Sequence, residues 1–192
     1  MIKVININTL KQDYKVYKLT DLFFDFLRKS EHIYFDKGTI IDLKKYSSNL
    51  IFFSKGILRE YTIDESGNDF TIQFINSKAF ILPKAMSYNI YFDSVKYLEV
   101  LQNSTLFVID KESFFNSIND SYLIQEIITR SFFEQMYFSN ERIKILLKKT
   151  IEQRYISFLS MYSDIIDYLP LSSIASFIGT TPSSLSRAKK HF

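Results

Sequence analysis

The segment 169–192 constrains the fold more than any other part of the chain, because two short helical patterns flank a single glycine there. The apolar side of the first helix consists of Ile174, Ala175 and Ile178. Gly179 stands where the chain must turn sharply, a position that favours a residue able to adopt positive φ. Two short helices joined by such a turn are typical of a helix-turn-helix.

The second helix has a clear start at Thr181 and Pro182. The Thr181 hydroxyl can cap the helix, and Pro182 falls at the first helical position, where its missing N–H costs nothing. Leu185, Ala188 and Phe192 are expected to face inward. The outer faces then carry polar and basic side chains: Ser183, Ser184, Arg187, Lys190 and His191.

Charge is distributed unevenly along the chain. Residues 141–192 contain eight Lys and Arg against four Asp and Glu, a net charge of +4, whereas the first 140 residues carry −1. Asp167 is the last acidic residue. A cationic terminus on a near-neutral body is the pattern expected of a protein that binds a phosphate backbone.

Two stretches resemble a known family. The residues IASFIGTTPSSLSR (174–187) are similar to the helix-turn-helix of Crp/Fnr bacterial transcription regulators, where an Ile-Ala…Gly…Ser-Arg pattern is typical. The residues GILREYTIDESGNDFTIQFI (56–75) resemble that family's effector domain, with Gly-x-x-Arg, a turn around Gly67 and a Thr-x-x-Phe strand. The resemblance covers nearly the whole chain in the family's order.

Short β-rich runs separated by turn residues begin near residue 33. Strands are predicted over residues 33–35, 39–43, 50–54, 57–62, 70–74, 95–101 and 105–109, and turns at 36–38, 54–56 and 64–68. Several short strands at regular spacing favour an antiparallel barrel or roll. The resemblance narrows this to a jelly-roll-like β-barrel.

The predicted fold class is therefore α+β, with an N-terminal antiparallel jelly-roll-like β-barrel, a long dimerisation helix and a C-terminal helix-turn-helix domain. Residues 1–119 would form the effector-type barrel, with flanking helices over 21–29 and 111–118. Residues 120–149 would form the long helix, and residues 150–192 the DNA-binding domain.

The stretch 122–149 contains no Gly or Pro and carries a seam of apolar positions at three- and four-residue steps. The seam consists of Ile124, Ile128, Phe132, Met136, Ser139, Ile143 and Leu147. A helix lying on the barrel would also need an apolar face. The resemblance implies instead a helix that pairs with a second copy, and helix-turn-helix proteins usually bind as symmetric dimers. Thr150 and Gln153 then predict a capping box for the next helix.

The helix from Thr181 onward is expected to enter the major groove. Arg187 matches the family's base-contacting Arg and can donate two hydrogen bonds to guanine O6 and N7. Pro182 and Ser183 stand at the family's other base-reading positions, so the target sequence cannot be carried over. Ser184 lies on the same first turn, within reach of base edges or phosphate.

Phosphate contacts add affinity without sequence information. They are expected from Thr181, Lys189, Lys190 and His191. Family members often continue into a β-hairpin wing, so we expect some backbone contact to be missing after Phe192.

Cyclic-nucleotide-binding members carry Gly-Glu and Arg in a phosphate cassette, because Arg neutralises the cyclic phosphate. The matching stretch here, 80–97, has no Gly, Glu or Arg, although Lys84 and Lys96 could supply charge. We therefore expect no response to cyclic nucleotides. Arg59 matches a position common across the family and is interpreted as structural. The effector is unknown, and there need not be one.

Composition excludes several classes of site. The chain has no Cys, which removes disulfides, Cys-ligated zinc and iron–sulfur clusters. His32 and His191 are far apart in sequence, and we expect no metal site and no cofactor. No apolar run approaches the roughly 20 residues of a membrane span, and no signal-peptide pattern begins the chain, so a cytoplasmic protein is expected.

The expected partners are double-stranded DNA and a second copy of the chain, and the resemblance leaves room for a contact with RNA polymerase. The alternative is a ligand-binding or protein-interaction module with no DNA-binding role. An enzyme is not expected, because Asp64, Glu65 and Asp69 cluster at a hairpin turn, where acids ordinarily form the turn.

Overall fold

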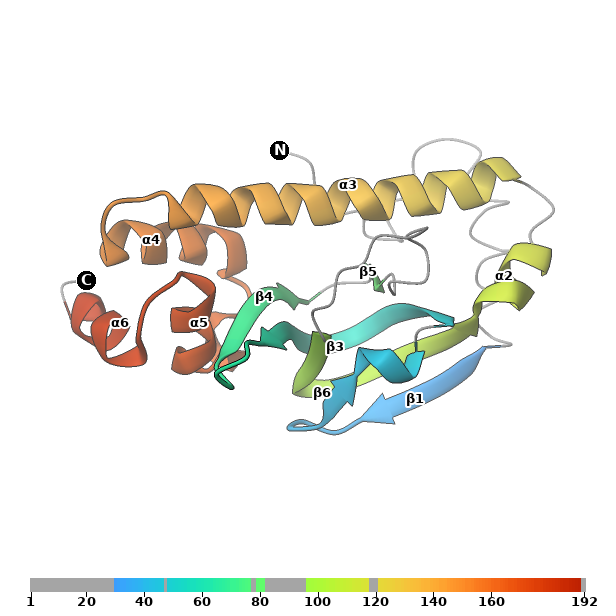
Figure 1. Cartoon of the computed structure of the whole chain (residues 1–192), viewed down its shortest axis with the longest axis horizontal. Coiled ribbons are helices and arrows are strands. Elements are labelled where there is room, and N and C mark those ends of the chain that lie inside the picture. Colours follow the sequence, from blue (N-terminus) through green and yellow to red (C-terminus); the bar gives the residue numbers. More distant parts are fainter. Residues whose placement is uncertain (1–29, 47, 77–78, 82–95, 118–120, 191–192) are drawn as a thin grey trace.

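The computed structural model describes residues 30–46, 48–76, 79–81, 96–117 and 121–190 (Figure 1). In this view the strands form one body, a long helix runs along its upper side, and the short C-terminal helices gather at one end. The helix predicted over 21–29 lies outside the described residues.

The described strands form one antiparallel sheet built on two long strands. The strands are β1 (Glu31–Phe35), β2 (Ile40–Asp42), β3 (Asn49–Ile63), β4 (Asp69–Ile75), β5 (Ala79–Ile81) and β6 (Lys96–Asp110). The pair β3–β6 forms the centre; β1 and β2 add to β6, whereas β4 and β5 add to β3. A short 3₁₀ helix, η1 (Leu43–Tyr46), follows β2.

The turn predicted at residues 54–56 is wrong, because the chain runs through this point as one 15-residue strand. The pairing of β3 with β6 shifts register around Gly56, which adopts a φ of +117°. A Cβ at Gly56 would lie 2.8 Å from the carbonyl oxygen of Asn103 on β6. Glycine therefore permits a bulge between two closely packed strands, a role that local sequence does not separate from a turn. The strands predicted over 95–101 and 105–109 are likewise one strand, β6.

The hairpin turn predicted at 64–68 is confirmed. The Asp64 carboxylate accepts hydrogen bonds from the backbone N–H groups of Ser66 (2.9 Å) and Asn68 (2.8 Å). The Asn68 side chain also donates to it, and this bond leads the contacts that lower the pKa of Asp64. Gly67 supplies a positive φ of +83°. Asp64 thus acts as a former of the turn between β3 and β4.

The helices follow the predicted order. They are α2 (Lys111–Ser117), α3 (Ser121–Leu146), α4 (Ile151–Tyr162), the 3₁₀ helix η3 (Ile166–Tyr168), α5 (Leu171–Phe177) and α6 (Pro182–Lys189). The long helix ends at Leu146, three residues before the predicted end. Thr150 caps α4 as predicted, its hydroxyl accepting from the Gln153 N–H at 3.2 Å.

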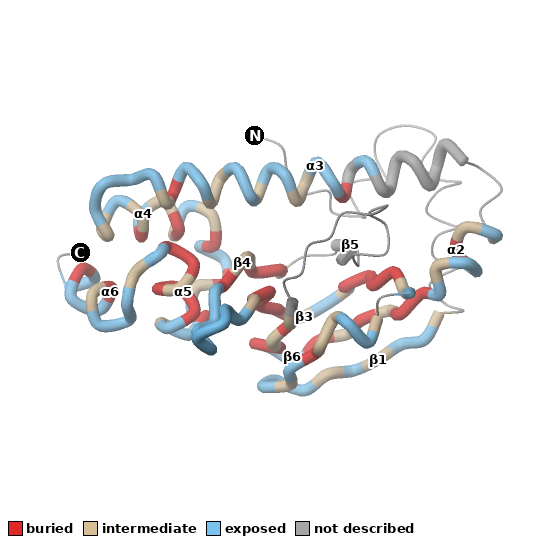
Figure 2. The backbone as a smooth tube through the Cα atoms, viewed as in Figure 1, coloured by how far each residue is buried: buried red, intermediate tan, exposed pale blue. Residues whose placement is uncertain are grey.

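One hydrophobic core spans the sheet and the C-terminal helices. Four rings meet in it, which we call the aromatic cluster: Phe74, Phe158, Tyr162 and Phe177. Phe74 comes from β4, whereas the other three come from α4 and α5. Buried segments accordingly meet where the sheet touches these helices (Figure 2). The C-terminal helices are therefore packed onto the sheet through shared apolar surface.

Candidate nucleic-acid interface

The turn between α5 and α6 has the predicted geometry. Gly179 adopts a φ of +68°. The Thr180 N–H donates to the Ala175 carbonyl (2.9 Å) and the Gly179 N–H to the Ser176 carbonyl (3.3 Å). Both bonds satisfy carbonyls that the end of a helix leaves without an intrahelical partner, and together they form a Schellman-type stop. The chain is thereby turned directly into α6.

The first turn of α6 is held by hydroxyl groups. Thr181 caps the helix, accepting from the Ser184 N–H at 3.2 Å, and Pro182 occupies the first helical position, as predicted. The Thr181 hydroxyl also donates to Ser184 Oγ at 3.0 Å, and it lies 3.0 Å from Ser183 Oγ. Arg187 donates to Ser184 Oγ at 3.3 Å. Ser184 is therefore tied to the cap and orients Arg187.

The outer face of α6 carries the predicted DNA-contacting side chains. Leu185 and Ala188 are buried, whereas Ser183, Arg187 and Lys190 are exposed at positions four and three residues apart. This spacing places them along one side of a helix. His191 lies outside the described residues.

Two further residues of α6 differ from the prediction: Ser186 was not predicted, and Lys189 lies on another side of the helix. Ser186 is exposed on the same side as Ser183, three residues earlier, and helical spacing alone could have identified it. Lys189 is also exposed, but its ammonium group lies 5.4 Å from the centre of the Tyr155 ring on α4. It therefore lies toward the α4 side of α6, off the line of Ser183 and Lys190.

Not every cation of the basic terminus faces solvent. Arg142 and Arg154 donate to backbone carbonyls at the turn between α5 and α6. Lys144 is exposed, but its charge is paired with Glu141 at 2.6 Å. The five exposed cations of residues 148–190 are Lys148, Lys149, Arg187, Lys189 and Lys190. The charge available for a phosphate backbone is concentrated at the two ends of the helix-turn-helix unit.

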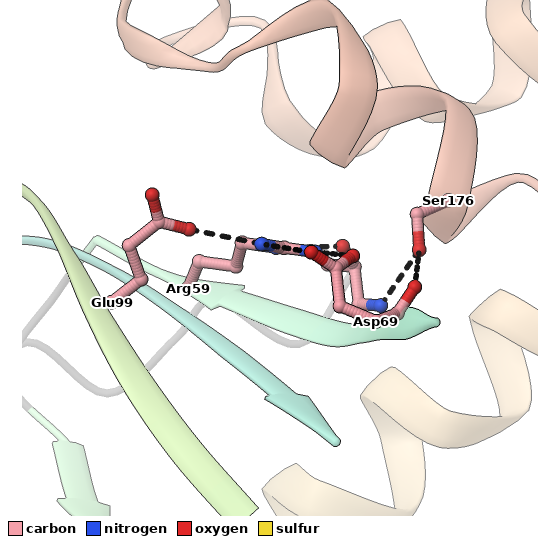
Figure 3. A network of polar contacts seen from close by, with 5 residues as sticks. Arg59, Asp69, Glu99 and Ser176 are labelled. Atoms are coloured by element: carbon pink, nitrogen blue, oxygen red, sulfur yellow. Dashed lines mark hydrogen bonds and ion pairs between the residues drawn. The ribbon is translucent and has the colours of Figure 1, made fainter. Parts of the chain in front are cut away.

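A polar network fixes α5 to the sheet (Figure 3). Ser176 Oγ accepts from the Thr71 N–H (2.9 Å) and donates to the Asp69 carbonyl (3.1 Å) on β4. Arg59 is buried beneath; it donates to Thr71 Oγ1 (2.8 Å) and to Glu99 (2.9 Å), and it forms an ion pair with Asp69. These contacts support the structural role predicted for Arg59, since its donors are engaged within the sheet.

The apolar seam predicted on α3 is exposed over its described part. Phe132, Met136, Ser139, Ile143 and Leu147 are all exposed, whereas the side chains of Ile124 and Ile128 lie outside the described residues. Phe133 and Tyr137, exposed beside the seam, were not predicted. Ser131 and Ile145 are buried. The helix therefore has one side packed on the chain and a second, apolar side that is exposed over the described residues.

A metal ion bound among the described residues would need several ligating side chains close together. No three His, Cys, Asp or Glu side chains converge there as a metal site would require. Most of the stretch compared with the nucleotide cassette, including Lys84, lies outside them. No helix among the described residues is both long and apolar enough to cross a bilayer.

Sequence comparisons give no match, either to protein-family models or to curated proteins. Solved structures do match. A Crp/Fnr-family transcriptional regulator from Eubacterium rectale has a TM-score of 0.72 at 19% identity, covering 93% of this chain and 86% of that one. The c-di-GMP-responsive global regulator CLP of Xanthomonas campestris has a TM-score of 0.72 at 15% identity, covering 90% of each chain.

A Crp/Fnr-family transcriptional regulator from Thermus thermophilus gives a TM-score of 0.62 at 15% identity, with 84% of each chain covered. Each of these matches covers more than four fifths of this chain. An antiparallel sheet followed by α3 and a C-terminal helix-turn-helix is thus the fold of the Crp/Fnr transcription regulators, and this chain has that fold.

Proposed function

We propose that the chain is a sequence-specific, DNA-binding transcription regulator of the Crp/Fnr type that acts as a homodimer. The observation that carries the proposal is α6, a capped helix with Ser183, Arg187 and Lys190 on one exposed side. A helix of this kind fits the major groove, where Arg can donate two hydrogen bonds to one guanine. The fold supports the proposal, since it is similar to that of transcriptional regulators whose sequences are 19% and 15% identical to this chain.

The dimer is proposed from the seam on α3. Leu147 is 77% exposed and Met136 58% exposed, and both lie on a helix of 26 residues or directly after it. Apolar side chains repeated at this spacing are buried when two such helices pair. A second copy would bury the seam and bring two α6 helices to one face of the DNA, as a two-fold site requires.

We also propose that the regulator does not respond to cyclic nucleotides. The stretch 80–97 lacks the Gly-Glu and the Arg of the phosphate cassette that cyclic-nucleotide-binding members carry, so no Arg is present to neutralise a cyclic phosphate. Calorimetric titration with cyclic AMP and cyclic GMP should give no heat of binding. Saturable binding of either nucleotide would contradict this part of the proposal.

The proposal is tested with Arg187→Ala, Lys190→Ala and a matched control, Lys45→Ala. Lys45 is exposed on η1, so the control removes the same charge away from α6. Affinity for a duplex enriched by the wild type from a random pool is measured by fluorescence anisotropy at several salt concentrations. Arg187→Ala should cost about 1–3 kcal/mol and flatten the preference at one base pair.

Lys190→Ala should instead weaken all duplexes alike and lower the slope of log affinity against log salt by about 0.9. The control should change neither the preference nor the slope. Base discrimination that survives Arg187→Ala intact would refute the role assigned to Arg187. Binding by the wild type that does not depend on salt would refute DNA binding through this face.

A further inference from the structure

The carbonyl end of α5 is held by two arginines from other helices. Arg142, on α3, donates from Nε to the Phe177 carbonyl at 3.2 Å, and its guanidinium carbon lies 5.2 Å from the centre of the Phe177 ring. Arg154, on α4, donates from Nη1 to the carbonyls of Ile178 and Gly179, both at 3.3 Å. The last carbonyls of a helix lack intrahelical partners and carry partial negative charge, so cations bind there favourably.

Arg142 is partly buried, and the loss of water around its guanidinium lowers its pKa. A buried cation is destabilising unless hydrogen bonds and nearby negative charge compensate for the lost water. The carbonyl of Phe177 and the face of its ring provide that compensation. A partly buried cation with two directional partners favours one orientation of the side chain, so Arg142 links α3 to the end of α5.

Arg154 adds a second connection to the same turn. Its Nε donates to the Lys148 carbonyl at 3.0 Å, just after the end of α3. Leu146, the last residue of α3, would lie 3.0 Å from a Cβ placed on Gly179. The end of α3 is therefore in contact with the turn, and α6 begins three residues after Gly179.

These contacts connect the dimer seam on α3 to the turn that precedes α6. Ile143, a residue of the proposed dimer seam, directly follows Arg142 on one continuous helix. The seam would fix the two α3 helices relative to each other, and the arginines fix the turn relative to α3. The contact of Ser176 with β4 does not replace this link, since β4 carries no seam residue.

We propose that Arg142 and Arg154 are positioning residues that set the distance between the two recognition helices, and hence the spacing between two DNA half-sites. The inference rests on the proposed function. Recognition helices of a symmetric dimer must match half-sites about 34 Å apart along the duplex. A turn that is free to tilt on α3 would accept several spacings.

The experiment uses the full chain and a random duplex pool, from which bound duplexes are recovered and sequenced. The variants are Arg142→Gln and Arg154→Gln, and the control is Lys144→Gln. Lys144 is an exposed cation on the same helix and pairs only with Glu141 among the described residues. Three quantities are compared: the half-site sequence, the distribution of spacings between half-sites, and the salt slope of binding.

The wild type and Lys144→Gln should enrich one spacing over its neighbours by about tenfold, roughly the effect of one charge-assisted hydrogen bond. Arg142→Gln and Arg154→Gln should keep the half-site sequence and the salt slope but reduce this preference to about twofold or threefold. An unchanged spacing preference in both variants would overturn the inference. A fall in slope of about 0.9 in either variant would also overturn it, since the lost group would then be a phosphate contact.

Arg142→Lys covers the case in which Arg142→Gln does not fold. Lys keeps a cation over the Phe177 ring but has no donor at the position of Nε. It should therefore broaden the spacing distribution to an intermediate extent, and a wild-type distribution would overturn the inference. A wild type that enriches no site at all would refute the proposed function, and this inference with it, whereas a normal wild type with unaffected variants would refute the inference alone.

Discussion

Phe74 packs the sheet against the C-terminal helices, so Phe74→Ala is expected to lower the free energy of unfolding. Phe74 is 3% exposed, and its ring centre lies 5.3 Å from Tyr162, 5.8 Å from Phe177 and 5.9 Å from Phe158. Truncation of a buried Phe to Ala costs about 3–5 kcal/mol. We expect a cost near ~4 kcal/mol rather than the lower limit, because the pairs with Phe158 and Tyr162 are edge-to-face and stabilise beyond their buried area.

Phe70→Ala is the matched control, because Phe70 lies on the same strand but is 44% exposed. Its loss should cost about 1 kcal/mol or less. The free energy of unfolding is measured by urea denaturation, followed by far-ultraviolet circular dichroism for the helices and by tyrosine fluorescence, since the chain has 13 Tyr and no Trp. Linear extrapolation then gives the difference between the two variants.

The expected difference between the two variants is about 3 kcal/mol, a large share of the 5–15 kcal/mol that stabilises a typical domain. Phe74→Ala should also separate the two spectroscopic transitions, because the sheet and the C-terminal helices would no longer unfold together. A Phe74→Ala protein within about 1 kcal/mol of Phe70→Ala would refute the view that Phe74 joins the two parts.

Three further predictions concern local features. Gly179→Ala should lower the free energy of unfolding, measured by calorimetric melts, by about 1 kcal/mol more than Gly67→Ala does. Both glycines have positive φ, but of the two only Gly179 has a side chain within reach of an added Cβ. Equal losses in the two variants would contradict this. Thr181→Ala should cost about 1 kcal/mol through loss of the helix cap and should lower amide protection in α6; unchanged hydrogen exchange would contradict the capping role. Burial raises the pKa of Tyr162 above its ordinary value of 10.0, so folding holds a proton that the unfolded chain releases, and stability should fall as pH rises above 10. Tyr162→Phe should remove up to about 1.4 kcal/mol per pH unit from that fall, measured by urea denaturation from pH 8 to 11, and an identical pH dependence in the variant would contradict the assignment.

Features set by neighbouring residues could be predicted from the sequence. The Thr181 cap, Pro182 at the first helical position and Gly179 in the turn depend on backbone dihedrals and hydrogen bonds within a few residues. The same holds for the acidic hairpin turn that begins at Asp64. The exposed face of α6 then followed from helical periodicity alone.

Features set by distant contacts could not be predicted in this way. Phe74 alternates with polar neighbours as any half-buried strand residue would, and nothing local shows that its partners lie on α4 and α5. Gly56 was assigned to a turn, because the β6 backbone that demands a glycine there is almost 50 residues away in sequence.

The roles of charged residues also depend on distant contacts that the sequence does not show. The sequence counts Arg142 and Arg154 with the basic groups available to DNA, but both donate to carbonyls of the helix-turn-helix turn. Ser186 was missed although its spacing of three residues from Ser183 places it on the same side of a helix. The structure shows it exposed there.

Sequence-specific reading of DNA by two copies of this chain is tested most directly by one selection experiment. The wild-type protein is titrated with a pool of random duplexes at two salt concentrations, and the retained duplexes are sequenced. We expect retention that weakens at the higher salt and a retained motif with two-fold symmetry. Retention that ignores salt, or retained duplexes without a shared symmetric motif, would contradict a dimeric regulator that reads DNA through α6.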